Sequence, residues 1–414
     1  MYGSPMDRGR HRLLPPGVTG DARRLLATRG LRGLADGLVS VLLAGYLARL
    51  GFTPLAIGAI VTGTLLGSAA LTIAVGLLGH RLERRHVLLG AAALMLATGA
   101  GFAGLTAFWP LLAVAVLGTL NPSAGDVSVF LPTEQAVLAQ AVRARDRTTM
   151  FAWYNLSGTL AGALGALASG MPELLARRYG VDITAAERAG FVFYAGVALV
   201  TAAIYRGLSP AVEHRVASPG RPLARSRRLV LGLAALFSLD SFGGGFVVQS
   251  LLVLWLYHRF QLSVATMAAV FFVAGLVGAV SQFVSARVAA RIGLVRTMVY
   301  THLPANVFLA LAGVMPNAPL AVLFLLLRAS LSQMDVPARQ SYVVAVVPPE
   351  ERAAAASLTN VPRSLATAVS PLLAGIMLEH SSFGWPLVCG GVLKAIYDLL
   401  LLARFAAVEP LEEA

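Results

Sequence analysis

Charged residues are scarce in this sequence, at 13% of 414 residues, which is about half of their share in soluble domains. Lysine is almost absent, because Lys394 is the single example and arginine supplies the rest of the fixed positive charge. Cys389 is the only cysteine, which excludes an intrachain disulfide framework and a cysteine metal cluster within one chain. The signatures of zinc proteases (H-E-x-x-H), serine hydrolases (G-x-S-x-G) and nucleotide-binding loops (G-x-x-x-x-G-K-S/T) are also missing. We therefore expect no enzymatic activity, no metal, no cofactor and no direct use of ATP.

Long apolar runs dominate the chain instead. Hydrophobic residues make up 57% of the sequence, and the mean hydropathy is +0.74. The runs are about 20 residues long, the length that a helix needs to cross a bilayer at a rise of about 1.5 Å per residue. We therefore predict an all-α membrane protein. Its twelve transmembrane helices are expected near residues 29–50, 54–78, 87–108, 111–134, 149–170, 189–208, 229–257, 265–287, 295–315, 318–339, 352–378 and 384–405.

The placement of arginine predicts how these helices are oriented. With the N-terminus in the cytoplasm, the inside segments contain 23 arginines and the outside segments contain 5. This split follows the positive-inside rule, so the formal charge of +13 is a topology signal. The arginines are not interleaved with aromatic residues, which excludes nucleic acid as a partner. We expect a multi-pass protein of a bacterial inner (plasma) membrane, in contact with lipid, with both termini in the cytoplasm.

The chain repeats itself at an offset of 205 residues. Arg147 and Asn155 recur as Arg352 and Asn360, so the fourth and fifth helices match the tenth and eleventh. Parallel six-helix repeats are typical of one large class of transporters. The expected parts are a basic cytoplasmic tail (1–28), an N-terminal six-helix bundle (29–208), a cytoplasmic linker (209–228), a C-terminal six-helix bundle (229–405) and a second cytoplasmic tail (406–414).

The loop between the second and third predicted helices resembles that of the major facilitator superfamily, which reads roughly G-x-L-A-D-R-x-G-R-R. The matching residues of this gating loop are Gly76, Arg81, Arg84 and Arg85. His80 stands where the family has Asp, so the loop's usual salt-bridge latch requires another acid, such as Glu83 or Glu134. The resemblance implies two six-helix bundles around a central cavity that opens alternately to each side of the membrane.

Four carboxylates interrupt the apolar helices. They lie in helices 1, 4, 7 and 10 at similar depth in the inner half of the membrane: Asp36, Asp126, Asp240 and Asp335. A charge inside the bilayer costs a few kcal/mol, so such residues usually face protein or water. The family resemblance implies that these four helices line the cavity, where a desolvated acid can take up a proton or bind a cation. Alternatively, the acids close the inner end by pairing with arginines such as Arg32 or Arg81.

Two arginines lie near the middle of the membrane in the C-terminal half. Arg328 precedes Asp335 by seven residues, which is two turns along the same helix face. Arg363 is placed to neutralise Asp240 or Asp335. Either arginine could instead bind an anionic substrate, because a guanidinium group suits carboxylate and phosphate. Further polar candidates for the cavity are Asn155, His302 and Asn306.

Small residues recur on the fifth helix at Gly158, Gly162 and Gly165. This spacing permits close helix packing, and it also resembles the family's antiporter pattern, which implies export by exchange. We predict a secondary active transporter that moves a small-molecule substrate by alternating access, coupled to protons, with export favoured and with the monomer as the active unit. The alternatives are a proton-coupled symporter for nutrient uptake and a membrane sensor that kept the fold but lost transport. The intramembrane charges favour the transporter.

Overall fold

The computed structural model describes residues 18–78, 82–123, 129–142, 147–213, 226–348 and 351–405. Within these ranges the chain forms helices and short connections, with no β-strand. The α-helices are α1 (Gly20–Arg49), α2 (Pro54–Leu78), α3 (Arg84–Gly104), α4 (Phe108–Leu117), α5 (Phe130–Ala141), α6 (Arg147–Ala168), α7 (Met171–Tyr179), α8 (Ile183–Arg206), α9 (Arg227–Gly245), α10 (Gln249–Phe260), α11 (Val264–Ile292), α12 (Leu294–Val314), α13 (Ala318–Ser332), α14 (Asp335–Ala345), α15 (Arg352–His380) and α16 (Trp385–Phe405). A single 3-10 helix among the described residues, η2 (Pro210–Glu213), follows α8.

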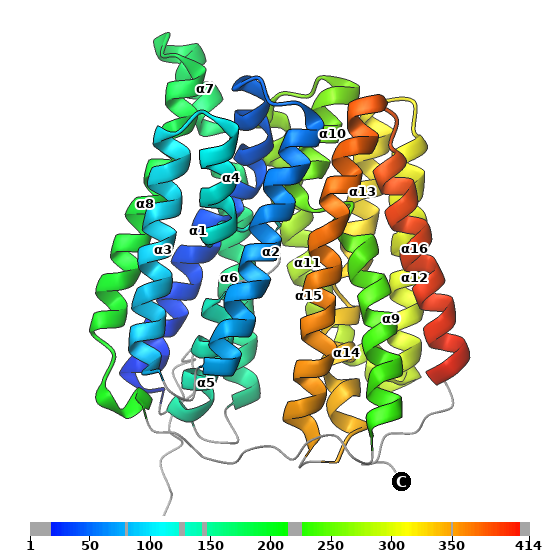
Figure 1. The fold of residues 1–414 in the computed structure, drawn as a ribbon. Coiled ribbons are helices and arrows are strands. Elements are labelled where there is room, and N and C mark those ends of the chain that lie inside the picture. The colour runs from blue at the N-terminus through cyan, green and yellow to red at the C-terminus, as the bar shows by residue number, and fades with distance from the viewer. Residues whose placement is uncertain are drawn as a thin grey trace, which may run out of the picture.

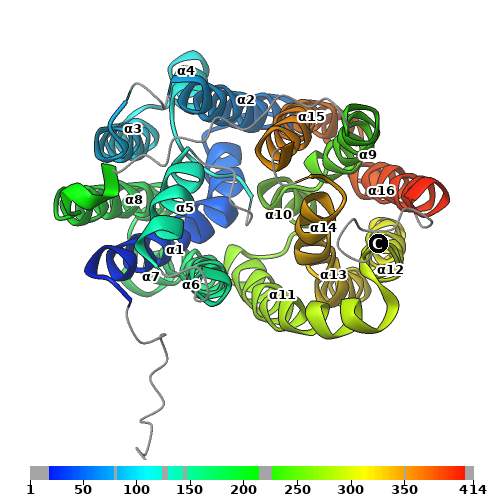
Figure 2. The ribbon, with the colours of Figure 1, turned by 90° about the horizontal axis from the view of Figure 1, so that it is seen from below.

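The helices form two bundles, α1–α8 and α9–α16, which lie side by side (Figures 1 and 2). In the first bundle α1 packs on α6, α3 on α8 and α2 on α4. In the second bundle α9 packs on α15, α12 on α16 and α11 on α13. Counted as membrane-spanning segments, both sets pair the first with the fifth, the third with the sixth and the second with the fourth. The repeat in the sequence is therefore a repeat in space, and the predicted fold class is confirmed.

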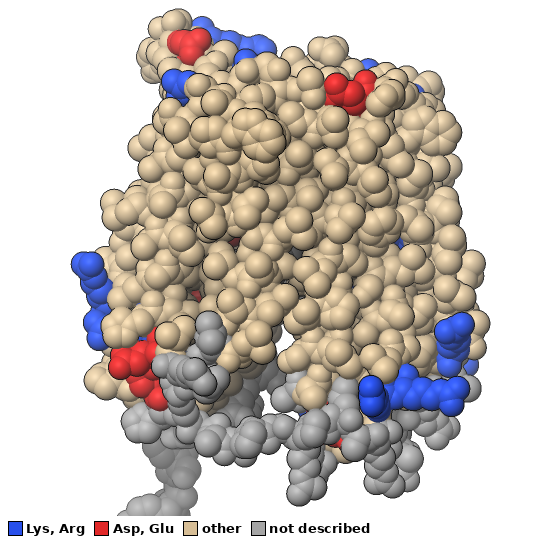
Figure 3. All heavy atoms as spheres, viewed as in Figure 1, with Lys and Arg blue, Asp and Glu red and all other residues tan. Residues whose placement is uncertain are grey.

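The surface of the molecule suits a bilayer. Eleven segments of the described chain are long and apolar enough to cross a membrane. The other predicted span, 111–134, corresponds to the short helices α4 and α5, with residues 124–128 outside the described ranges. Figure 3 shows charged side chains near the two ends of the molecule and an almost uncharged band between them. Because exposed charge is costly in hydrocarbon, this band marks a multi-pass integral membrane protein.

One C-terminal span predicted as a single helix, 229–257, is interrupted. It consists of α9 and α10, which are joined by residues 246–248. The break directly follows the three glycines at 243–245, and glycine is the least favourable residue in a helix apart from proline. The side chains of α9 and α10 therefore project around a bend near the centre of the bundle.

A second span, predicted as 318–339, is also interrupted. It consists of α13 and α14, with residues 333–334 between them. Pro337, in the first turn of α14, lacks the N–H that a continuous helix would donate to the carbonyl of Gln333. The break makes Asp335 the first residue of α14.

Other helix boundaries differ from the predicted ones because capping extends helices beyond the apolar runs. The α1 helix begins at Gly20 rather than near residue 29, and the hydroxyl of Thr19 accepts a hydrogen bond of 3.2 Å from the N–H of Ala22. Asp182 caps α8 in the same way, at 2.8 Å from the N–H of Ala185. The short α7 lies between two predicted spans and was not expected.

The small residues of α6 are explained by packing against α1. A Cβ atom on Gly37 would lie 2.0 Å from the carbonyl oxygen of Gly162, and one on Gly165 would lie 1.9 Å from the carbonyl oxygen of Leu34. A methyl group at either position would force the helices apart. Gly37 and Gly165 therefore allow the close contact of α1 with α6, whereas a Cβ on Gly162 would meet nothing closer than 3.5 Å.

The bundles contact each other at the end of the molecule opposite the start of α1 and the end of α16, which is the upper end in Figure 1. The N–H of Leu55 on α2 donates to Glu379 Oε2 on α15 at 3.0 Å. The N–H of Ala265 on α11 donates to Glu173 Oε2 on α7, also at 3.0 Å. At the lower end, Figure 3 shows a notch between the two halves. The described residues are thus arranged in a form that is closed at the upper end.

Candidate functional site

A cavity of about 440 Å³ lies between the two bundles, a size typical of small-molecule sites. The N-terminal bundle lines it with small or uncharged residues: Ser123, Thr159, Gly162, Ala163 and Ala166. Of the described lining residues, those with a fixed charge all come from the C-terminal bundle: Asp240, Arg328, Asp335, Arg339, Arg363 and Lys394. In the described part of the lining, one wall of the cavity is therefore neutral, and the other is rich in charge.

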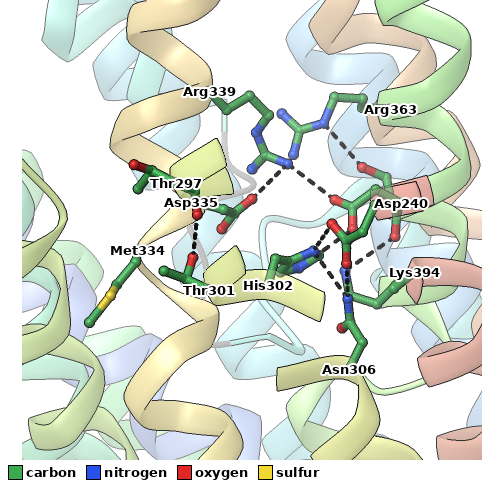
Figure 4. Close-up of polar contacts among 12 residues, drawn as sticks. Asp240, Thr297, Thr301, His302, Asn306, Met334, Asp335, Arg339, Arg363 and Lys394 are labelled. Carbon is green, nitrogen blue, oxygen red and sulfur yellow. Dashed lines mark hydrogen bonds and ion pairs between the residues drawn. The ribbon is translucent and has the colours of Figure 1, made fainter. Parts of the chain in front are cut away.

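Asp240 on α9 is the centre of the charged wall (Figure 4). Lys394 Nζ, on α16, lies 2.5 Å from Asp240 Oδ1 and 3.4 Å from the backbone carbonyl oxygen of the same residue. Arg339 Nη1, on α14, lies 3.1 Å from Asp240 Oδ2. The three side chains are each at least 90% buried. Two cations from two helices thus share one buried carboxylate, which ties α14 and α16 to α9.

Asp335 supplies a second carboxylate to the same cation. Its Oδ2 atom lies 3.4 Å from Arg339 Nη1, in an i,i+4 pair on the first turn of α14. The break between α13 and α14 allows this arrangement, because it starts a new helix with its first turn beside the cavity. Arg339 therefore bridges Asp240 and Asp335.

Behind Asp240, a buried chain of polar groups continues between α12 and α16. His302 Nε2 lies 3.7 Å from Asp240 Oδ1, and His302 Nδ1 lies 2.9 Å from Asp398 Oδ1. Asn306 Nδ2 donates to Asp398 Oδ2 at 2.8 Å. The Asp398 side chain has no exposed surface. Asp240, His302 and Asp398 therefore form a path along which protonation of one group affects the next.

Arg328 and Arg363 line the same cavity but differ from Arg339 in their partners. Arg363 Nε donates to Ser241 Oγ at 3.1 Å and Arg363 Nη1 to Asn360 Oδ1 at 3.3 Å, so both acceptors are neutral. The Nε atom of Arg328 on α13 is buried and has no hydrogen-bond partner. Within the described part of the chain, neither arginine forms an ion pair with a carboxylate. Arg339 and Lys394, rather than Arg363, neutralise Asp240.

The other predicted coupling residues lie elsewhere or outside the described ranges. Asp36 on α1 lines a separate, much smaller pocket together with Arg29 and Asn121. Asn155 on α6 is exposed and is not among the residues that line the central cavity. Asp126 falls outside the described residues. The structure thus brings Asp240, Asp335, Arg328 and Arg363 together, and it places Asp36 and Asn155 apart from them.

Glu134, one of the acids considered for the gating loop, lies instead in the core of the N-terminal bundle. Its carboxylate forms an ion pair with Arg32 on α1 and accepts hydrogen bonds from the hydroxyls of Thr28 (2.8 Å), Tyr154 (2.5 Å) and Tyr205 (2.5 Å). Glu134 has no exposed surface. It therefore ties α5 to α1, α6 and α8.

The described part of the gating loop is held by Glu213 of η2. The N–H groups of Arg84 and Arg85, at the start of α3, donate to the two carboxylate oxygens of Glu213 at 2.8 and 2.9 Å. Arg84 also donates to Gln140 on α5 at 2.6 Å. Gly76 is exposed near the end of α2. His80 and Arg81 lie outside the described residues.

Three charged residues of this site were not predicted from the sequence: Arg339 and Lys394, which line the cavity, and Asp398, which lies behind Asp240. The signal for two of them was present, because Lys394 and Asp398 are four residues apart within an otherwise apolar span. Arg339 follows Asp335 by four residues, which is the same spacing of opposite charges on one helix face. No group of three or more His, Cys, Asp or Glu residues in the described ranges is arranged to hold a metal ion.

Comparisons with known proteins agree with the fold. The sequence profile described as Major Facilitator Superfamily matches residues 25–332. An "Uncharacterized membrane protein YJR124C" of Saccharomyces cerevisiae is 27% identical, over 94% of this chain and 95% of that protein. Among solved structures, the nucleoside transporter NupG has a TM-score of 0.73 at 13% identity, covering 94% of this chain and 99% of that one. The inward open xylose transporter XylE from E. coli has a TM-score of 0.72 at 15% identity, covering 95% and 98%.

Proposed function

Because the chain belongs to the major facilitator superfamily, and is a membrane transporter rather than an enzyme, we propose that it is a secondary active transporter driven by protons. The bundles at 29–208 and 229–405 rock against each other and expose the central cavity to each side of the membrane in turn. The observation that carries this proposal is the cavity itself, which lies between the bundles and has a charged wall. A cluster of charges inside the membrane is costly, and those that proteins retain usually mark a functional site.

The cavity opens to the cytoplasm in the arrangement described above. The start of α1 and the end of α16 lie at the lower end in Figure 1, and the arginine distribution assigns that end to the cytoplasm. The contacts of Leu55 with Glu379 and of Ala265 with Glu173 close the other end. Breaking these contacts and closing the lower notch would expose the cavity to the outside.

Proton coupling is assigned to Asp240 and the path behind it. Protonating Asp240 removes the charge that holds Lys394 and Arg339, so α14 and α16 are released from α9. His302 extends the path to Asp398, and histidine is the side chain that most readily exchanges a proton near neutral pH. Proton binding therefore changes contacts between helices of the C-terminal bundle, and we assign the coupling to this change.

The charge of the cavity supports a proposal for the direction of transport. The glycine pattern that favoured export lies at the contact of α6 with α1, where Gly165 is needed for close packing. Among the described lining residues, four fixed cations outnumber two carboxylates, and a bound proton adds to this excess. A proton and an anion therefore strengthen each other's binding in one cavity, whereas a proton and a cation would compete. This favours the second candidate, a proton symporter that takes up its solute, over an exporter that works by exchange.

Distances between spin labels test alternating access without knowledge of the solute. Replacing Cys389 by Ser allows labels at introduced cysteines. One pair joins Trp109 and Trp385 at the upper end, and the other joins Leu77 and Leu231 at the lower end, all four being exposed. We expect two populations at each pair, with the upper distance long when the lower one is short. A single distance at both pairs under every condition would support the sensor instead.

The same labels test proton coupling. Acidification should shift the two populations in the parent protein, and Asp240→Asn should abolish this shift. Asp182→Asn is the matched control, because Asp182 is an exposed helix cap and asparagine caps equally well. If Asp240→Asn responds to pH as the parent does, Asp240 is a structural ion-pair partner and the coupling lies elsewhere.

A further inference from the structure

Two cations of the cavity lack counter-charges in the described chain. The carboxylates of Asp240 and Asp335 are matched by Arg339 and Lys394. Arg328 and Arg363 remain, and both line the cavity. Both arginines are half-buried, and a cation withdrawn from water without a paired anion is unfavourable, because its desolvation is not compensated. The ion pairs of the described residues therefore do not explain why two arginines lie here.

The hydrogen-bonding capacity of these arginines is also unfilled. A guanidinium group has five N–H donors, which match the oxygens of a carboxylate or phosphate in pairs. Arg363 uses two nitrogen atoms on neutral acceptors, Ser241 Oγ and Asn360 Oδ1. The buried Nε of Arg328 has no acceptor. Arg363 thus uses its donors on neutral acceptors instead of the anionic oxygens that suit them, and Arg328 lines the same cavity.

Among the described residues, the opposite wall offers no competing charge. The lining residues from the N-terminal bundle are the uncharged Ser123, Thr159, Gly162, Ala163 and Ala166. From the described residues, a solute that enters the cavity therefore meets excess positive charge on one side and small neutral groups on the other. Neutral sugars or nucleosides would not use this charge, and an organic cation would be repelled by it.

We propose that the transported solute is a small organic anion, with carboxylate or phosphate oxygens bound by Arg328 and Arg363. This inference rests on the proposed function, because it takes the central cavity as the solute site. Asp240, Arg339 and Lys394 form the coupling group beside it, and Arg328 and Arg363 hold the anion. The two arginines come from different helices, α13 and α15, so a bound anion also links the two.

Thermal unfolding of the purified full-length protein in detergent tests the proposal. The probes are succinate and glycerol 3-phosphate, which distinguish carboxylate from phosphate, and their neutral counterparts are succinamide and glycerol. Sodium chloride holds the ionic strength constant. We expect one or both anions to raise the unfolding midpoint in a saturable way, and the neutral compounds to leave it unchanged.

Variants then locate the binding site. Arg328→Gln and Arg363→Gln should each raise the apparent Kd of the anion at least about tenfold, whereas Arg178→Gln, on the exposed surface of α7, should bind as the parent does. Arg328→Lys and Arg363→Lys keep the charge, and they serve as the test if a Gln variant does not fold. Three outcomes would overturn the proposal. The first is that the neutral compounds raise the unfolding midpoint as much as the anions do, the second is that neither anion raises it, and the third is that both arginine variants bind the anion as the parent does.

This experiment and the spin-label experiment fail independently. Alternating populations without anion binding would refute the anionic substrate and leave the transporter intact. Anion binding with a single, fixed set of distances would refute alternating access and leave the assignment of Arg328 and Arg363 in place.

Discussion

Replacing Glu134 by Gln should be among the most destabilising single changes in the N-terminal bundle. The carboxylate is fully buried, pairs with Arg32 and accepts hydrogen bonds from three hydroxyls. Glutamine keeps the shape but removes the charge, and it turns one acceptor into a donor that faces hydroxyl groups. Removing one partner of a buried ion pair costs about 3–5 kcal/mol. With a shift of about 2–4 °C per kcal/mol for a unit of this size, the midpoint of thermal unfolding should fall by roughly 6–20 °C.

Thermal unfolding followed by tryptophan fluorescence measures this loss, and a double-mutant cycle assigns it. Arg32→Gln/Glu134→Gln should lose less than the sum of the two single variants, because the second change removes a charge that is already without its partner. The exposed Asp182→Asn should change the midpoint by less than about 2 °C. Two results would show that Glu134 does not hold the bundle together. One is a midpoint of Glu134→Gln that differs from the parent by no more than that of Asp182→Asn, and the other is a double variant whose loss equals the sum of the two single losses.

Three further predictions follow from contacts of the described residues. Lys394→Met should abolish proton-driven transport and lower the free energy of unfolding by about 1.5–3 kcal/mol. Adding Asp240→Asn should restore part of this stability but no transport, as measured by thermal unfolding and by transport into proteoliposomes. Gly37→Ala should lower the free energy of unfolding by about 1–3 kcal/mol or more, because its Cβ would lie 2.0 Å from the Gly162 carbonyl oxygen. Gly162→Ala is the control, because its Cβ would lie no closer than 3.5 Å to another atom and should be tolerated. Equal losses of the two variants in thermal unfolding would contradict this account of the α1–α6 contact. In a Cys389→Ser background, a membrane-impermeant maleimide should label Trp385→Cys in intact cells but Leu77→Cys only after permeabilisation, and the reverse result would invert the assigned orientation.

The sequence was sufficient for the fold class because the governing signals are local. Apolar runs of membrane length locate the spans, and the offset of 205 residues relates the two halves. The breaks in two spans were missed, although residues 243–245 and Pro337 are both visible in the sequence, because hydropathy alone does not distinguish a bent helix from a straight one.

The candidate site was only partly predictable because pairing between helices depends on tertiary geometry. Asp240 and Arg363 were both identified as intramembrane charges, but the sequence does not show that Lys394 lies nearer to Asp240 than Arg363 does. Glu134 was assigned to the gating loop by its position near the inner end of a helix. Its partners Arg32 and Tyr205 are 102 and 71 residues away in the sequence, and packing alone brings them together.

Proton movement into proteoliposomes during anion entry is the most direct test of proton-coupled transport through the charged cavity. The vesicles contain the reconstituted parent protein and a pH-sensitive dye, and an inward gradient of succinate or glycerol 3-phosphate is imposed. We predict that the interior acidifies with the parent protein and with Arg178→Gln, and that Asp240→Asn and Arg328→Gln abolish the acidification. An unchanged interior with the parent, or equal acidification by Asp240→Asn, would contradict the account, and alkalinisation would indicate exchange instead of symport.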